Sequence, residues 1–161
     1  MSRAVIAFGA NLGDREATID EAVRELADAP GVDLMAVSPI YETAAIKHEG
    51  VDRSAPRYLN GVIIVETVLE PHALLDLLQR IEQQHGRVRA EHWGDRTLDL
   101  DLIDLDGRVV ADDRLVLPHP RAWERAFVLQ PWLDLEPEAE LPGRGPIAAL
   151  RAAASDEVVR R

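Results

Sequence analysis

Hydrophobic and polar residues repeat with two different periods along this chain, and these periods predict an ordered series of strands and helices. Runs rich in apolar and β-branched residues predict strands at Arg3–Gly9, Val32–Tyr41 and Tyr58–Leu69. Apolar residues three and four positions apart predict helices over Arg15–Ala27 and Pro71–Gln84. The order of these elements predicts strands that pack against helices around one core.

The expected helix ends carry residues that favour starting or stopping a helix. Asp14 precedes the first helix as a candidate N-cap, Pro71 occupies the first turn of the second helix, and Gly86 follows its last turn. Between the second and third strands, Ala44–Pro56 is expected to be a long polar loop. A loop of this length is either functional or disordered.

Strict alternation of leucine and aspartate over Leu98–Ile103 predicts a further strand. Side chains at positions i and i+2 leave a strand on the same face, so Asp99 and Asp101 project together while the leucines face the core. Two neighbouring carboxylates are unfavourable unless a cation lies between them, and hard oxygen ligands favour Mg²⁺. The alternative is the solvated face of an amphipathic strand, which the short pattern alone does not exclude.

The remainder of the chain is predicted to be shorter elements. Asp106-Gly107 predicts a turn, Arg121–Pro131 and Ile147–Ala154 are expected to be helical, and Val158–Arg161 is expected to be frayed. The whole pattern predicts the α+β class, a mostly antiparallel sheet with helices packed on it, in one domain over residues 1–161.

Composition and charge narrow the possible functions. The 161 residues are 47% hydrophobic and 29% charged, which suits one domain with a proper core. A net charge of −11 argues against nucleic acid as a partner. The chain has no cysteine and no apolar run near the roughly 18 residues of a membrane span. Because the N-terminus does not resemble a signal peptide, we expect a cytoplasmic protein with no membrane partner. We also expect it to be a monomer.

Two polar groupings stand out against this background. Tyr58 and Asn60 share one strand face, where an amide could bind the edge of a heterocycle and an aromatic ring could cover it. Both could instead be ordinary strand and turn residues. Arg87, Arg89 and Arg96 flank the aspartate pair, and guanidinium groups bind phosphate oxygens through two donors. Surface arginines that balance nearby glutamates are the alternative.

A longer string makes the acidic motif more specific. The sequence WGDRTLDLDLI at residues 93–103 resembles the WGPRTLDLDI signature of the 6-hydroxymethyl-7,8-dihydropterin pyrophosphokinases, a family of folate biosynthesis, with Asp95 replacing the usual proline. The segments GANLG at 9–13, YLN at 58–60, RLVLPH at 114–119 and RAFVLQP at 125–131 are also similar to family motifs. At 43–47 the sequence TAAIK departs from the family's T-x-P-x-G element.

The resemblance implies a ferredoxin-like α/β sandwich and a specific reaction. This reaction is the Mg²⁺-dependent transfer of pyrophosphate from ATP to 6-hydroxymethyl-7,8-dihydropterin, with release of AMP. Two Mg²⁺ ions would be bound by Asp99 and Asp101. Other Mg²⁺-dependent phosphotransferases or phosphodiesterases, and a non-catalytic binding module of the same fold, are the alternatives.

The resemblance also implies roles for individual residues. The implied catalytic residues are Arg87, Arg96, Asp99 and Asp101. The implied pterin site consists of Gly9, Thr43, Tyr58, Asn60, Trp93 and Phe127. The implied ATP site consists of Gln79, Glu82, Arg89, Leu102, Arg114, His119 and Arg125. From the residues alone, His119 could be structural and Phe127 could be a core residue.

Overall fold

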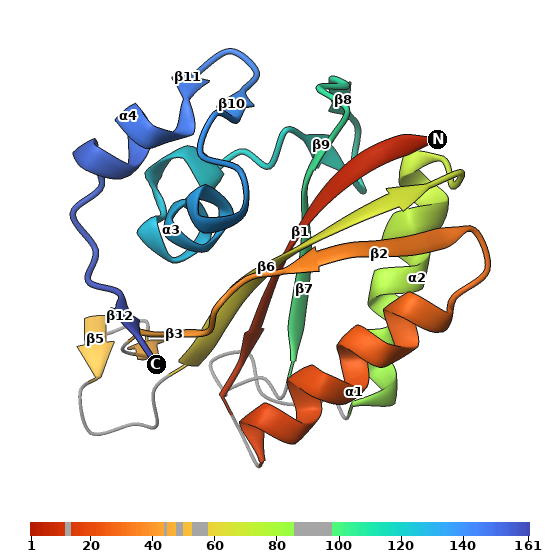
Figure 1. Cartoon of the computed structure of the whole chain (residues 1–161), viewed down its shortest axis with the longest axis horizontal. Coiled ribbons are helices and arrows are strands. Elements are labelled where there is room, and N and C mark those ends of the chain that lie inside the picture. The colour runs from red at the N-terminus through yellow and green to blue at the C-terminus, as the bar shows by residue number, and fades with distance from the viewer. Residues whose placement is uncertain (12–13, 44, 48–49, 53–57, 86–97) are drawn as a thin grey trace.

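A computed structural model describes residues 1–11, 14–43, 45–47, 50–52, 58–85 and 98–161 (Figure 1). The main sheet and the two helices between its strands comprise β1 Ser2–Ala10, α1 Arg15–Asp28, β2 Val32–Val37, β3 Tyr41–Thr43, β6 Tyr58–Thr67, α2 Pro71–Gln84, β7 Asp99–Leu105 and β12 Val159–Arg160. The other elements are β4 Ala45–Lys47, β5 Gly50–Asp52, β8 Val110–Ala111, β9 Val116–Leu117, the 3₁₀ helix η1 Ala122–Glu124, α3 Ala126–Leu135, β10 Glu140–Leu141, β11 Gly145–Pro146 and α4 Ile147–Ala153.

The main sheet has the order β12-β3-β6-β1-β7, with β2 also paired to β6, and every pair is antiparallel. The elements β1, α1, β2, β6, α2 and β7 therefore follow a β-α-β-β-α-β sequence, and β1 lies between β6 and β7. This is the ferredoxin-like arrangement. The predicted fold class, an antiparallel sheet with helices packed on it, is confirmed.

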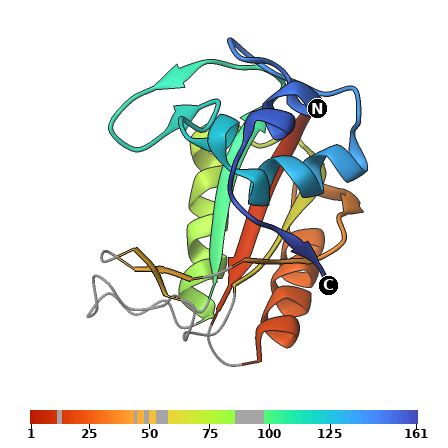
Figure 2. The same cartoon turned by 90° about the vertical axis from the view of Figure 1, so that its left-hand side faces the viewer.

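Alternating side chains along the central strand build two cores, one on each face of the sheet. Ile6 and Phe8 pack with α1 and α2, whereas Val5 and Ala7 pack with α3 and α4. We call these sides the α1/α2 face and the α3 face; both are visible when Figures 1 and 2 are compared. Because both faces are covered, a functional site is restricted to the ends and edges of the sheet. No helix in the described residues is long and apolar enough to cross a membrane.

The two helices expected between the strands form as predicted. α2 has the predicted bounds, and α1 ends one residue later than expected. Asp14 caps α1 by accepting a hydrogen bond from the Ala17 backbone N–H at 3.1 Å.

The single strand expected over Val32–Tyr41 is wrong, because this segment is divided into β2 and β3. Pro39 lies at the break and has no N–H to continue a ladder. Directly after β2, the Ser38 hydroxyl accepts a hydrogen bond from the Val62 N–H at 2.9 Å. Beyond the break, β3 pairs with the first residues of β6.

Three other expectations need correction. Within Ala44–Pro56, the described residues form a β4–β5 hairpin, so the segment is not a loop throughout. The helix expected over Arg121–Pro131 is instead η1 followed by α3, which continues through Pro131 to Leu135. Val158–Arg161 is not frayed, because β12 pairs with β3.

Candidate active site

The two aspartates of the acidic motif lie side by side on β7, at the edge of the sheet. Asp99 pairs with Gly9 and Asp101 pairs with Ala7, and both aspartates are half-buried. Leu100 lies between them and is buried on the α1/α2 face. The two carboxylates therefore project on the α3 face, as the alternation predicts.

A row of residues across the sheet connects this acidic pair to the candidate pterin residues. Gly9 is paired with Asn60 on one side and with Asp99 on the other. A Cβ atom at Gly9 would lie 3.0 Å from Asn60 Nδ2 and 3.9 Å from Tyr58 Cδ1. Even a methyl group at Gly9 would therefore press on the Asn60 amide, which lies directly against this glycine.

The Asn60 amide is buried and held from the neighbouring strand. The Thr43 hydroxyl of β3 donates a hydrogen bond to Asn60 Oδ1 at 2.7 Å. This contact directs the other end of the amide, Nδ2, towards Gly9. Gly9 of β1, Thr43 of β3, and Tyr58 and Asn60 of β6 therefore form one cluster.

His119 approaches the acidic pair from the segment after β9. Its backbone N–H donates to the Ile103 carbonyl at 2.8 Å, and the Arg121 N–H donates to His119 Nδ1 at 3.2 Å. Because Nδ1 accepts, the proton of the neutral ring lies on Nε2. Burial lowers the pKa of His119, and the positive charges of Arg125 and Arg121 add to this effect against the attraction of Asp101. The lowered pKa favours the neutral ring, in which Nε2–H is the hydrogen-bond donor.

Arg125 and Phe127 lie at the start of α3, over the same face of the sheet. The Arg125 guanidinium is 5.4 Å from the centre of the Phe127 ring, and Phe127 is partly buried against the α3-face core. Burial lowers the pKa of Arg125, whereas the Asp101 charge opposes this shift. An arginine keeps its charge despite such a shift, so the site contains a half-buried cation close to a carboxylate.

The candidate ATP residues of α2 and β7 have different surroundings. Glu82 is buried and accepts a hydrogen bond from the Leu100 N–H at 2.8 Å, so it holds the edge strand that carries the aspartates. The side chain of Leu102 is buried in the core, which leaves only its backbone to contact a nucleotide. Gln79 is exposed on α2.

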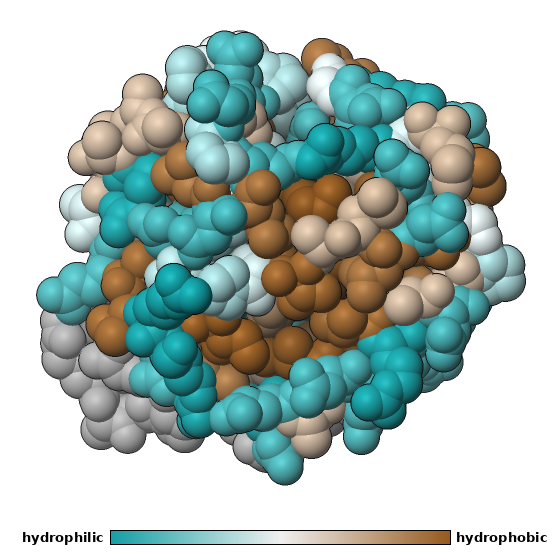
Figure 3. Space-filling view, viewed as in Figure 1, coloured by the Kyte–Doolittle hydropathy of each residue, from teal (hydrophilic) through white to brown (hydrophobic). Residues whose placement is uncertain are grey.

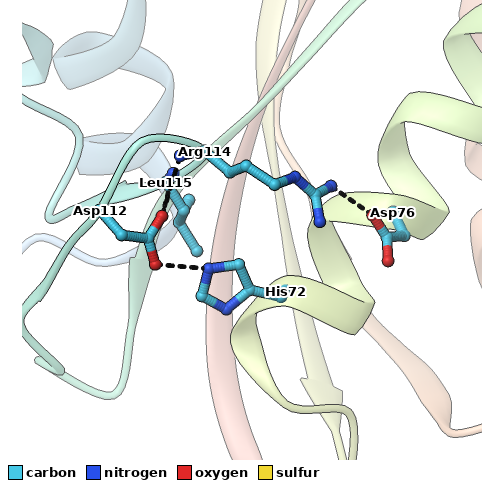
Figure 4. A network of polar contacts seen from close by, with 5 residues as sticks. All are labelled: His72, Asp76, Asp112, Arg114 and Leu115. Carbon is cyan, nitrogen blue, oxygen red and sulfur yellow. Dashed lines mark hydrogen bonds and ion pairs between the residues drawn. The ribbon is translucent and has the colours of Figure 1, made fainter.

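Arg114 is part of a surface network between α2 and the β8–β9 connection (Figure 4). Its guanidinium forms an ion pair with Asp76, one turn of α2 before Gln79. Asp112 accepts hydrogen bonds from the backbone N–H groups of Arg114 and Leu115, both at 2.9 Å. The structure therefore places Arg114 beside α2, with Asp76 as its partner.

Four predicted residues, Arg87, Arg89, Trp93 and Arg96, lie outside the described residues. In the part of the chain that is described, no cluster of three or more His, Asp or Glu side chains could hold a metal ion. Asp99 and Asp101 nevertheless suit Mg²⁺, which is commonly bound by one or two carboxylates with water and substrate phosphates as its other ligands.

Sequence reasoning missed two buried polar residues near this site. Tyr41 is paired in register with Asn60, and its hydroxyl donates to Asp134 of α3. Burial and this contact raise the pKa of Tyr41 to about 12. Asn11 is also buried, and its amide has no hydrogen-bond partner in the described part of the chain. The GANLG motif contains Asn11, whereas no local pattern indicates the Tyr41–Asp134 pair.

A groove of about 490 Å³ lies elsewhere, between α1 and β2. Its lining includes Phe8, Val23, Leu34 and Ile40, and none of the predicted site residues. Figure 3 shows apolar side chains gathered near the middle of this view of the molecule. The groove is therefore separate from the candidate active site.

Paired carboxylates suit Mg²⁺, and an imidazole with a guanidinium suits phosphate oxygens, so the site has the groups that an enzyme of phosphoryl transfer needs. Residues 5–137 match the family model described as 7,8-dihydro-6-hydroxymethylpterin-pyrophosphokinase (HPPK). The chain belongs to this family. The family and the enzyme class expected from the sequence are thereby confirmed.

Individual relatives agree with this assignment. The chain is 39% identical over 143 residues to the 2-amino-4-hydroxy-6-hydroxymethyldihydropteridine pyrophosphokinase of Methylorubrum extorquens, covering 89% of this chain and 88% of the relative. It is 38% identical over 161 residues to the enzyme of the same name from Pseudomonas aeruginosa, covering 100% of this chain and 97% of the relative.

Solved structures show the same fold at low sequence identity. The wild-type HPPK-DHPS of Plasmodium falciparum with pteroate matches with a TM-score of 0.70 and 15% identity, over 94% of this chain and 42% of that chain. An HPPK-DHPS in complex with substrates matches with a TM-score of 0.70 and 15% identity, over 94% and 43% of the two chains. This chain therefore spans less than half the length of these solved chains.

Proposed function

We propose that this chain transfers the pyrophosphoryl group of ATP to the hydroxymethyl oxygen of 6-hydroxymethyl-7,8-dihydropterin. The hydroxyl oxygen forms a bond to the β-phosphorus, the bond from that phosphorus to the α–β bridging oxygen breaks, and AMP leaves. The hydroxyl proton is released. Family membership supports the reaction, and one observation carries it: Gly9 lies in register with Asn60 on one side and with Asp99 on the other.

The pterin is proposed to bind on the α3 face, beside Gly9. Asn60, oriented by Thr43, would pair with the polar edge of the ring, and an amide suits this task because it is both donor and acceptor. Tyr58 and Phe127 would cover the ring faces, with Trp93 as a further aromatic contact. This position brings the hydroxymethyl group near the acidic pair.

Asp99 and Asp101 are proposed to hold two Mg²⁺ ions. Bound Mg²⁺ would neutralise the triphosphate and polarise the attacking hydroxyl. Phosphoryl transfer of this kind depends mainly on positioning and on charge neutralisation. The contribution of the protein is therefore to hold two carboxylates side by side on the edge strand that Glu82 fixes.

The cationic and donor groups are proposed to bind the phosphates and the nucleoside. The neutral His119 ring offers its Nε2–H to a phosphate oxygen, and Arg125 offers a charge already held close to Asp101. We assign Arg87 and Arg96 to the charge of the transferring group and Arg89 to the phosphates. Further contacts to ATP are proposed for Gln79, Glu82, Leu102 and Arg114. We also propose that residues 1–161 act as one domain and that the protein is a cytoplasmic monomer.

A product assay on Asp101→Ala tests this assignment. The variant is expected to form no detectable AMP from ATP and the pterin, because half of the metal-binding pair is lost. Asp33→Ala is the matched control, since Asp33 is an exposed aspartate on β2 of the same sheet. Near-normal AMP formation by Asp101→Ala would refute the metal site, and formation of ADP by the wild type would refute the pyrophosphoryl transfer.

A further inference from the structure

The strand that carries Thr43 is short and is held on both edges. β3 has three residues, and it pairs with β6 through the Tyr41–Asn60, Glu42–Leu59 and Thr43–Tyr58 matches. On its other edge, β12 pairs Val159 with Glu42 and Arg160 with Tyr41 (Figure 1). Without β12, β3 would be an edge strand with half of its backbone partners.

The residue after β12 reinforces this pairing with three contacts. The Arg161 backbone N–H donates to the Ile40 carbonyl at 2.9 Å. Its guanidinium lies 2.7 Å from a carboxylate oxygen of Glu42 and 2.5 Å from one of Glu16. Arg161 therefore connects β3 to the first turn of α1.

Both bridged elements adjoin candidate pterin residues along the chain. Glu42 directly precedes Thr43, and Glu16 lies in the helix that follows the segment after Gly9. Leu59, the partner of Glu42, is buried on the α1/α2 face. The ion pairs of Arg161 thus lie behind β3, whereas Thr43 and Asn60 face α3, so Arg161 can hold the strand without contacting a substrate.

We propose that Val159–Arg161 form a latch that sets the position of Thr43 and thereby the orientation of the Asn60 amide. Arg161 is a positioning residue for the pterin site, and this role rests on the proposed assignment of Thr43 and Asn60 to pterin binding. The match to the family model ends at residue 137, so the latch lies beyond the part of the chain that the family model covers.

The effect of the latch follows from the geometry of one hydrogen bond. The Thr43–Asn60 contact is 2.7 Å long, and hydrogen bonds weaken steeply with distance and misalignment. If β3 shifts outwards when the Arg161 ion pairs with Glu42 and Glu16 are lost, the hydroxyl moves away from Oδ1 and the amide is free to rotate. The pterin must then order the amide on binding, which lowers pterin affinity. ATP binding should be unaffected, because α2, β7 and β9 do not pair with β3.

The experiment compares Arg161→Ala with Arg161→Lys and with the matched control Arg108→Ala. Arg108 is an arginine of similar exposure, 42% against 38%, that pairs with Glu70 at the other end of the sheet. Pterin affinity, ATP affinity, kcat and both KM values are measured for each variant. For Arg161→Ala we expect pterin Kd and KM to rise roughly three- to fivefold, because two ion pairs are lost and each is partly exposed to water. ATP affinity and kcat should change by no more than about twofold.

Arg161→Lys should bind the pterin more tightly than Arg161→Ala, because the ammonium group keeps the positive charge. It should still bind more weakly than the wild type, because lysine lacks the planar guanidinium that contacts both carboxylates. Adding Glu42→Gln to Arg161→Ala should cost less than the sum of the two single changes, since both remove the same contact. Unchanged pterin affinity in Arg161→Ala would overturn the latch. Equal loss of pterin and ATP affinity would also overturn it, because that result indicates general destabilisation.

A second measurement separates this proposal from the proposed function. In the ligand-free protein, the NMR signals of the Asn60 side-chain amide should shift or broaden in Arg161→Ala and stay unchanged in Arg108→Ala. An unchanged Asn60 signal refutes the latch. A wild type that forms no AMP refutes the proposed function, whether or not the Asn60 signal responds.

Discussion

Replacing Gly9 by alanine tests whether the Asn60 amide beside it binds the pterin. The added Cβ atom would lie 3.0 Å from Asn60 Nδ2, whereas ordinary contacts begin at 3.4 Å. The amide must therefore move by about 0.4 Å, the difference between these distances. It cannot move freely, because Asn60 is buried and its Oδ1 accepts from Thr43.

Two effects on stability oppose each other in this variant. Overpacking of a buried site costs roughly 1–3 kcal/mol. Replacing glycine by alanine stabilises a protein by about 0.4–1 kcal/mol where alanine can adopt the backbone conformation. Gly9 meets this condition, because its φ is not positive. Together these ranges predict a net loss of stability of about 0–2.6 kcal/mol. Pterin affinity should fall at least roughly tenfold, which corresponds to about 1.4 kcal/mol.

Gly61→Ala is the matched control for this experiment. A Cβ atom at Gly61 would lie 2.2 Å from Cζ of Phe8, a ring buried on the α1/α2 face, so this change should destabilise the fold by roughly 3 kcal/mol or more. Urea denaturation and pterin titration by calorimetry measure the two quantities. The reasoning is refuted if Gly9→Ala binds pterin normally, or if it loses as much stability as Gly61→Ala.

Two further predictions concern buried polar contacts. Glu82→Ala should lower the free energy of unfolding by roughly 1–3 kcal/mol in urea denaturation, because the Leu100 N–H loses its acceptor. Glu82→Gln keeps an oxygen there, so an equal loss in both variants would contradict this. Burial and the Asp134 contact raise the pKa of Tyr41 in the folded state from 10.0 to about 12. The neutral phenol therefore contributes its full stabilisation of the fold below pH 10, and this stabilisation is lost as the pH rises towards 12. Absorbance titration of wild type minus Tyr41→Phe should show a phenol that ionises near pH 12; ionisation near pH 10 would disprove the burial effect.

Local sequence patterns determined the helices, their caps and the residues that share one face of a strand. The apolar spacing of Pro71–Gln84 predicts a helix with the observed bounds, and Asp14 caps its helix as its position indicates. The Leu–Asp alternation placed Asp99 and Asp101 together, because a strand has a period of two whatever it packs against. The roles of Arg87, Arg89, Trp93 and Arg96 stay predictions, since these residues lie outside the described part of the chain.

Only the tertiary structure decided which distant segments meet. The hydroxyl of Tyr41 reaches Asp134 of α3, Glu82 accepts from Leu100, and Arg161 bridges two elements near the other end of the chain. None of these pairs has a fixed sequence spacing that a periodic pattern could reveal. Their physical basis is the pairing of strands and the burial of both sheet faces, which depend on the whole chain folding at once.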